Sequence, residues 1–314
     1  MTATKKKMKQ HVAILMCTYN GAQYLEAQLA SVLRQTHTDW SLWVSDDGST
    51  DETLVILEKF FRRLKQPFFL VQGHCRGAAG NFVSLIQREN IEADYFSFCD
   101  QDDVWPPDKL ERALKWHDGL SAEVPNLYGG RTRLVDSDSN VIGYSPLFSR
   151  KPSFSNALVQ SVMGGNTMLM NRAARALWLK TPRDADIVSH DWWSYILVSG
   201  ASGNVHYATV PVLDYRQHDA NVFGANTGWR ARLIRLWMLA NGNFREWTDK
   251  LTGVLEKIQN DVLTPENREV FQDFQQVHSD RVLARLKGAR KSAVHRQTGA
   301  ENLGLWLAVL LKKI

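Results

Sequence analysis

The first hundred residues alternate short apolar runs with amphipathic segments, and this alternation strongly restricts the fold. Apolar runs at residues 12–17, 41–45, 68–72 and 94–99 have the length and composition of buried strands. The three segments between them carry apolar residues at helical spacing. Strands that alternate with helices in this way form a parallel sheet joined by crossover helices. We therefore predict an α/β fold with a Rossmann-like, mostly parallel sheet flanked by helices.

The composition is typical of a globular protein. The chain has 314 residues, of which 44% are hydrophobic and 23% are charged, so one large domain or two are expected. It has no apolar run of about 18 residues, and no membrane-spanning helix is expected. The apolar run after the basic N-terminal residues is too short for a signal peptide. Cys17, Cys75 and Cys99 form no metal-binding pair, which favours reduced thiols in a cytoplasmic protein.

Positive charge is concentrated near the C-terminus. Residues 228–314 contain 15 lysines and arginines against 9 aspartates and glutamates, a net charge of +6, whereas the whole chain carries +5. We predict a catalytic domain at 1–225 and a helical, basic region at 226–314, whose first helix lies around 229–237. Tryptophans accompany the basic residues there, which suits binding to an anionic membrane surface and equally a homo-oligomer contact; a solvated helical face is the third alternative. No recognised nucleic-acid-binding module is present, so no nucleic-acid partner is expected.

Three of the predicted strands end in polar clusters. These clusters are TYNG at 18–21, DDGST at 46–50 and DQDD at 100–103. Since ligands of such sheets bind at the carboxyl ends of the strands, we expect the three clusters to meet along one edge. The Ser, Thr and Asp residues after Asp47 suit a helix start. Asp46 and Asp47 have no such structural duty, and one of them could accept the ring N–H of uracil or thymine.

The DQDD cluster is the strongest candidate for chemistry. It places Asp100, Asp102 and Asp103 within four residues, just before a Trp and two prolines. Carboxylates at this spacing can supply oxygen ligands to Mg²⁺ or Mn²⁺. A solvated turn is one alternative. Another is that Asp103 or Asp108 caps the helix that begins near the prolines, which is compatible with a metal role for the other carboxylates.

Two longer segments carry a family resemblance: LMCTYNGAQYLEAQLASVLRQTHTDWSLWVSDDGSTDET and FCDQDDVWPPDKL. Together they resemble the inverting glycosyltransferases of family 2, which have the GT-A fold, and the resemblance covers about residues 11–220. The segments YGGRTRLVDSDSN, GGNTM and YRQHDANVFG are similar to bacterial rhamnosyltransferases that build surface polysaccharides. The resemblance therefore implies a GT-A domain with a helical C-terminal extension.

The resemblance also implies roles for individual residues. The nucleotide-sugar would be bound by Thr18, Tyr19, Asn20, Asp46, Asp47, Arg76 and Asp100, with Tyr19 beside the base. The segment around Arg76 departs from the commoner family pattern. Within the DxD-type motif, Asp102 would bind the metal and Asp100 would contact ribose or a metal-bound water. His218 would approach the metal or the diphosphate, where Arg216 would add positive charge. Gly164, Gly165 and Asn166 would contact the acceptor, although this segment also suits a plain turn.

An inverting transfer requires a base that deprotonates the acceptor hydroxyl. The segment SHDWWSY offers Asp191 at a predicted helix start, where the family has its catalytic acidic residue. An N-cap residue is the alternative role for Asp191. The family usually has Glu or Asp where His190 stands, so only Asp191 carries over.

Taken with the resemblance, the residues predict a metal-dependent inverting glycosyltransferase that uses Mg²⁺ or Mn²⁺. The donor would be a nucleotide-diphospho-sugar, specifically dTDP-rhamnose, and the acceptor a lipid-linked oligosaccharide of O-antigen or capsule assembly at the cytoplasmic membrane. One alternative is a sugar-phosphate nucleotidyltransferase, but CTYNGAQYL has a single glycine and no basic residue for a phosphate loop. Another is a non-catalytic nucleotide-sugar-binding subunit, which would need neither Asp102 nor Asp191.

Overall fold

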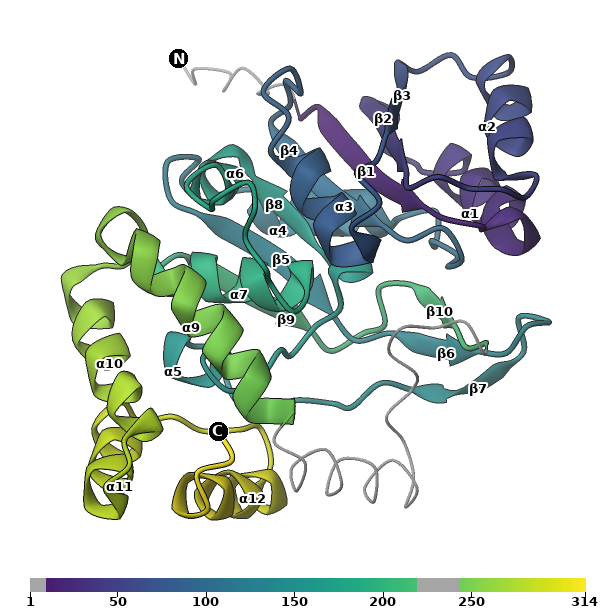
Figure 1. Cartoon of the computed structure of the whole chain (residues 1–314). Helices are drawn as coiled ribbons and strands as arrows, with labels where there is room; N and C mark the ends of the chain where they lie inside the picture. The colour runs from purple at the N-terminus through teal and green to yellow at the C-terminus, as the bar shows by residue number, and fades with distance from the viewer. Residues whose placement is uncertain (1–9, 219–242) are drawn as a thin grey trace, which may run out of the picture.

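A seven-stranded, mostly parallel sheet forms the centre of the computed structural model, which describes residues 10–218 and 243–314 (Figure 1). Its strands follow the order β3-β2-β1-β4-β8-β5-β9. In that order the strands are β3 (Phe68–Gln72), β2 (Trp40–Asp46), β1 (Val12–Thr18), β4 (Tyr95–Cys99), β8 (Leu169–Asn171), β5 (Asn126–Gly130) and β9 (Asn204–Ala208). β1 pairs in parallel with both β2 and β4, and β2 pairs in parallel with β3. The predicted parallel arrangement of the first four strands is confirmed.

The first strand is apolar throughout because the sheet is covered on both faces. Alternate side chains of a strand point to opposite faces. Ala13 and Leu15 belong to one buried cluster, which also contains residues of the helices α3 (Gly77–Ile86) and α7 (His190–Gly200). Ile14 and Met16 belong to a second cluster, with residues of the helices α1 (Ala22–Leu33) and α4 (Lys109–His117). A continuous run such as VAILMCT is therefore required at this position.

The predicted crossover helices are present. They are α1 (Ala22–Leu33), α2 (Thr53–Phe61), α3 (Gly77–Ile86) and α4 (Lys109–His117), the last beginning after the two prolines as expected. Further along the chain are α5 (Phe154–Ala157), the short 3₁₀ helix η1 (Gly165–Thr167), α6 (Arg172–Trp178) and α7 (His190–Gly200). The middle of α3 lies beside the start of α7, since the rings of Phe82 and His190 stack at 4.0 Å between centroids.

The middle of the chain differs from the expectation in two places. The sequence of residues 127–143 predicts two strands joined by an Asp/Ser/Asn turn, but these residues contribute to three strands, β5, β6 (Arg133–Val135) and β7 (Val141–Tyr144). The sequence also predicts one strand around 205–215, which is divided into β9 and β10 (Asp214–Arg216). Pro211 lies between β9 and β10, and proline interrupts a strand because it lacks an N–H donor. β10, β6 and β7 form a separate three-stranded sheet beside the central one (Figure 1).

The C-terminal part is helical, as predicted. It contains α9 (Asn243–Val262), α10 (Pro265–Gln275), the 3₁₀ helix η2 (Gln276–His278), α11 (Val282–Lys291) and α12 (Gly299–Leu310). These helices lie at the opposite end of the molecule from α1–α3 (Figure 1). Their buried residues belong to the same apolar core as α5 and α7. The proposed domain boundary near 225 and the helix expected around 229–237 lie outside the described residues. Within residues 10–218 and 243–314, no helix is both long and apolar enough to span a membrane.

Candidate active site

The three polar clusters meet at the carboxyl edge of the sheet, as the sequence predicts. The Thr18 hydroxyl, at the end of β1, donates to Oδ2 of Asp46, at the end of β2, at 2.8 Å. The side-chain amide of Gln101, after β4, accepts from the Tyr19 N–H at 2.9 Å and donates to the Tyr19 carbonyl at 3.0 Å. The loops after β1, β2 and β4 therefore form one hydrogen-bonded unit.

Asp46 organises the loop that follows β2. Its carboxylate accepts hydrogen bonds from the Thr18 hydroxyl, the Ser49 hydroxyl, the Ser49 N–H and the Gly48 N–H, at 2.6 to 3.2 Å. These four donors occupy both oxygens. Gly48 has φ of +92°, a left-handed conformation that glycine adopts without strain and that turns the loop back onto Asp46. Asp46 is therefore buried and fully satisfied by its own loop.

Asp47 has a different set of partners. Its Oδ1 accepts from the Cys75 N–H at 2.7 Å and its Oδ2 accepts from the Gly77 N–H at 3.1 Å. These contacts fix the segment between β3 and α3. Each oxygen accepts one of these hydrogen bonds, so Asp47 keeps acceptor capacity that Asp46 lacks.

Asn20 and Tyr19 have contrasting positions after β1. Asn20 has φ of +47°, and its Oδ1 accepts from the Thr50 N–H at 2.8 Å. This side chain therefore connects the loops after β1 and β2. The Tyr19 side chain is 58% exposed at the same edge. Of the two, Tyr19 presents its ring to solvent at the point where a ligand could stack on it.

The carboxylates of the DQDD cluster occupy three different environments. Asp103 is fully buried, accepts from the Asn166 side chain at 2.6 Å, and has a strongly raised pKa because it is desolvated next to Asp102 and Asp100. Asp100 is half-buried; desolvation, followed by the charges of Asp102 and Asp191, raises its pKa to about 8. The Asp191 carboxylate therefore lies close enough to this cluster to repel the Asp100 carboxylate electrostatically.

Asp102 meets His218 directly. Its Oδ2 lies 2.8 Å from His218 Nε2, although the two residues come from loops after β4 and β10. The imidazole also stacks on Tyr24 of α1, with ring centroids 4.9 Å apart. The two predicted metal ligands are thus neighbours in space.

Arg216 is hydrogen-bonded to the loop that carries Asp102. Its Nε donates to the Asp102 carbonyl at 3.1 Å, and its guanidinium also donates to the carbonyls of Asp136 and Ser137 in the β6–β7 turn. The guanidinium lies 4.8 Å from the centroid of the Tyr24 ring. Arg216 is buried and joins the β6–β7 turn to the acidic loop.

Asp191 lies in the first turn of α7. Its Oδ1 accepts from the Trp192 N–H at 2.8 Å, and its side chain is half-buried. The neighbouring His190 packs on Phe82 and edge-on against Phe98, and burial lowers its pKa to about 4. The imidazole is therefore neutral near pH 7. Its Nε2 has no hydrogen-bond partner among the residues that the structure describes.

The Gly164–Gly165–Asn166 segment lies over His190 and beside the acidic loop. A Cβ placed on Gly165 would overlap the His190 ring, so glycine is required there by close approach. Asn166 is buried and donates to Asp103 rather than facing solvent. The segment thus contacts two parts of the candidate site. Asn166 contacts Asp103, and Gly165 contacts the start of α7.

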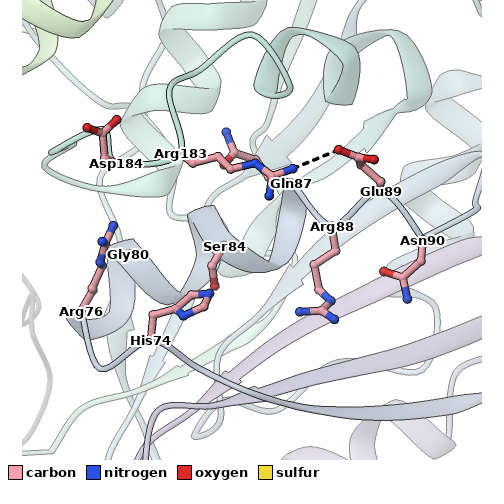
Figure 2. A pocket seen from close by; sticks show the side chains of 10 residues that line it. All are labelled: His74, Arg76, Gly80, Ser84, Gln87, Arg88, Glu89, Asn90, Arg183 and Asp184. Carbon is pink, nitrogen blue, oxygen red and sulfur yellow. Dashed lines mark hydrogen bonds and ion pairs between the residues drawn. The ribbon is translucent and has the colours of Figure 1, made fainter.

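Arg76 lies apart from the strand-end cluster. Its exposed side chain lines a groove of about 650 Å³ along α3, together with His74, Ser84, Arg88 and Arg183 (Figure 2). An ion pair between Arg183 and Glu89, 3.0 Å apart, lies on the rim. None of Thr18, Asp46, Asp102 or Asp191 lines this groove. This groove therefore lies beside the candidate active site and not at it.

Asp102 and His218 supply only some of the ligands that a divalent cation needs. A carboxylate at Asp102 and an imidazole at His218 suit Mn²⁺ or Mg²⁺, which complete their coordination with substrate phosphates and water. In the described part of the chain, no group of three or more His, Cys, Asp or Glu side chains is arranged to bind a metal without such help. Besides desolvation, repulsion by Asp102 and Asp191 raises the pKa of Asp100, and a bound cation would reduce this repulsion.

Two residues at the site were not singled out from the sequence. Gln101 lies inside the acidic motif, and its contact with the Tyr19 backbone could have been suspected from its place between two strand ends. The sequence places Tyr24 only among the apolar residues at helical spacing in GAQYLEAQLASVLRQT. No local signal showed that its ring would lie between Arg216 and His218.

The fold is that of the GT-A class. The mannosyltransferase PcManGT of Pyrobaculum calidifontis, solved with GDP-Man and Mn²⁺, superimposes with a TM-score of 0.54 at 16% identity, over 96% of this chain and 80% of that one. S. aureus TarS residues 1–349, solved with UDP-GlcNAc, superimposes with a TM-score of 0.56 at 16% identity, over 96% and 88%. Residues 13–178 match the family description "Glycosyl transferase family 2". This chain therefore belongs to glycosyltransferase family 2 and is a glycosyltransferase.

Curated relatives agree with this membership. The dTDP-rhamnosyl transferase RfbG of Shigella flexneri is 30% identical over 256 residues, which are 76% of this chain and 84% of the relative. The UDP-Glc:alpha-D-GlcNAc-diphosphoundecaprenol beta-1,3-glucosyltransferase WfgD of Escherichia coli is 28% identical over 162 residues, which are 51% of this chain and 60% of the relative.

Proposed function

We propose that the chain transfers L-rhamnose from dTDP-rhamnose to a hydroxyl of a lipid-linked oligosaccharide, with inversion, in the biosynthesis of a surface polysaccharide such as O-antigen or capsule. The similarity to RfbG, over most of both chains, supports the choice of donor. The observation that carries the chemistry is the convergence of Asp100, Asp102 and Asp191. Both Asp102 and Asp191 act on the charge of Asp100 at one edge of the sheet.

Asp102 and His218 would hold a Mg²⁺ or Mn²⁺ ion. PcManGT, which shares the fold, is a complex with GDP-Man and Mn²⁺. When bound, such a cation stabilises the charge of a leaving diphosphate. Arg216, which binds the Asp102 carbonyl, and Tyr24, which stacks on His218, hold the two ligands in place. Asp100 would contact ribose or a metal-bound water.

Asp191 would be the general base. Its Oδ1 is held by the Trp192 N–H, which leaves Oδ2 to accept the proton of the acceptor hydroxyl. The neutral His190 beside it adds no second charge. Repulsion of Asp191 by the acidic loop is also reduced if a cation occupies the Asp102 side, because opposite charges stabilise ionised carboxylates.

The nucleotide would bind over the loops after β1 and β2. We assign base stacking to the exposed Tyr19 ring and the base N–H contact to Asp47, which keeps acceptor capacity. Thr18 donates to Asp46, and Asn20 accepts from the Thr50 N–H, so these residues shape the two loops. Arg76 would reach toward the donor from the adjoining groove.

The acceptor would approach along Gly164, Gly165 and Asn166. These residues lie between the acidic loop and the start of α7, where an acceptor hydroxyl must meet both donor and base. WfgD, by its name, acts on a diphosphoundecaprenol-linked sugar, which supports a lipid-linked acceptor. An enzyme with such an acceptor would work at the cytoplasmic face of the membrane, with residues 226–314 as the region that contacts the membrane.

A panel of nucleotide-sugars with Mn²⁺ or Mg²⁺ tests this function. Thermal shift and donor hydrolysis are measured for dTDP-rhamnose, UDP-glucose, UDP-GlcNAc and GDP-mannose. We expect the largest stabilisation and the fastest hydrolysis with dTDP-rhamnose, and both should be lost with a chelator. Stabilisation by another donor would overturn the choice of sugar, and stabilisation by none would overturn the proposal.

A further inference from the structure

The C-terminal helix α12 is apolar on both of its sides. Leu305, Ala308 and Val309 are buried against the rest of the protein. The opposite side carries Leu303, Trp306, Leu307, Leu310 and Leu311, which are between 38% and 66% exposed. Their spacing of three, four, seven and eight residues places them in one stripe, about 12 Å long at the rise of a helix. An ordinary surface helix has polar residues on this side.

The neighbouring helix α11 also exposes apolar side chains near its start. Arg285 of α11 donates to the carbonyls of Val309 and Leu310, both at 2.7 Å, so the two helices meet near the end of the stripe. The neighbouring residues Val282 and Leu283 are 45% and 81% exposed. We call this surface the α11–α12 face; it consists of Val282, Leu283, Leu303, Trp306, Leu307, Leu310 and Leu311. A set of large apolar side chains exposed together marks an interaction surface.

The charge around this face is positive. Residues 280–314 contain eight lysines and arginines and two acidic residues. Lys287 and Arg290 are exposed four and seven residues after Leu283, on the same side of α11. Lys312 and Lys313 follow the stripe directly, and Lys312 forms an ion pair with Asp280. A tryptophan among leucines, bordered by basic residues, is the pattern of helices that lie in a membrane interface.

We infer that the α11–α12 face docks on an anionic lipid bilayer, with the apolar stripe among the acyl chains and the basic residues at the headgroups. A second copy of the chain fits less well, because a symmetric contact would bring two basic borders together. Anionic lipid supplies the opposite charge. The inference rests on the proposed function, because an enzyme with a lipid-linked acceptor must reach that acceptor at a membrane.

Vesicle sedimentation of the full chain tests the inference without substrate. The chain is pelleted with vesicles of phosphatidylglycerol and phosphatidylethanolamine, or of phosphatidylcholine alone. We expect binding to the anionic vesicles that weakens with added salt, and at least tenfold weaker binding for the Leu307→Glu/Leu311→Glu variant. Val210→Glu, at a valine 65% exposed between β9 and β10, adds a negative charge elsewhere and should bind as the unchanged protein does. Leu307→Ser/Leu311→Ser replaces the first variant if its melting curve shows loss of fold.

Equal pelleting of the double variant and the unchanged protein would overturn the inference. So would a dimer in light scattering that the double variant converts to a monomer while vesicle binding is unaffected, because the face would then bind a second copy. Transfer to a water-soluble acceptor is measured in parallel. Weak pelleting of the double variant with normal transfer supports the inference. Failure of the unchanged protein to transfer to any acceptor counts against the proposed function, and the pelleting result still decides the inference.

Discussion

His218 Nε2 lies 2.8 Å from Asp102 Oδ2, across 116 residues of sequence. The contact joins the loop after β4 to the residues after β10. It places an imidazole nitrogen and a carboxylate oxygen at the edge of the sheet where the polar loops meet. Arg216 and Tyr24 fix the geometry of this pair from two other elements.

If this pair holds the cation, removing either member should remove most metal-dependent binding. Asp102→Asn and His218→Ala should each lose at least about 1.4 kcal/mol of Mn²⁺-dependent nucleotide affinity, which is a tenfold change. The measurement is titration calorimetry with dTDP, with Mn²⁺ and with a chelator. Asp108→Asn serves as the control, because Asp108 follows the same loop and its side chain is 53% exposed. Unchanged Mn²⁺ dependence in both variants would show that the ligands lie elsewhere.

Asp191→Asn should separate catalysis from donor binding. The amide cannot take a proton, so kcat should fall by about 10² to 10⁴, the range of general base catalysis. The α7 helix start keeps its shape, since the amide oxygen can still accept from the Trp192 N–H. Donor affinity, measured by calorimetry with dTDP, should remain nearly unchanged. An equal loss of donor affinity would place Asp191 in the donor site instead.

The strand ends could be predicted from the sequence because the signals are local. Alternating apolar and amphipathic runs predicted β1 to β4, and the rule for parallel sheets then placed Thr18, Asp46 and the acidic loop at one edge. The contacts of Asp103 could not be predicted in this way. Asn166 and the Arg216 N–H reach it from 63 and 113 residues away, and such pairings depend on how β8 and β10 pack. The division of 205–215 into two strands was also missed, although Pro211 was a visible signal.

The two adjacent carboxylates after β2 should respond differently to the same substitution. In Asp46→Asn an NH₂ group would face donors that now bind an oxygen, which costs about 1–3 kcal/mol of unfolding free energy. Asp47 accepts from two backbone N–H groups instead of four donors, so Asp47→Asn should cost less stability and weaken dTDP binding more. Urea unfolding and calorimetry on both variants test this contrast. The reverse order of effects would assign the base contact to Asp46.

Lys109 should make stability depend on pH. It is buried beneath the acidic loop, its Nζ is 3.7 Å from the centroid of the Trp105 ring, and desolvation lowers its pKa from 10.5 to about 7. Between these values the unfolded chain holds a proton that folded Lys109 has released. The unfolding free energy should therefore rise with pH in this window, by at most about 1.4 kcal/mol per pH unit from this group.

The comparison that isolates this effect uses Lys109→Met. Urea unfolding at pH 7.5 and at pH 9.5 should show a smaller rise in stability for this variant than for the unchanged protein. Lys115→Met, on the exposed side of the same helix, should keep the full rise. If Lys109→Met keeps the same pH slope, the buried amine remains charged throughout this range.

Gly165 and His190 should be energetically coupled. The Cβ of Gly165→Ala would overlap the His190 ring, which cannot move easily because it packs on Phe82 and Phe98. Overpacking of this kind costs about 1–3 kcal/mol. His190→Ala removes the obstructing ring, so in the double variant the alanine at 165 should cost little. Chemical unfolding of the two single variants and the double variant measures the coupling.

Gly253→Ala is the matched control, since a Cβ there meets open space in the helix α9. It should be neutral or stabilise by about 0.5–1 kcal/mol, because alanine favours helices over glycine. Acceptor KM, measured on the same set, should rise for Gly165→Ala and recover in part in the double variant if this loop guides the acceptor toward Asp191. Strict additivity of the unfolding free energies would mean that the loop moves away from α7 without strain, and the close approach would then place no constraint on the site.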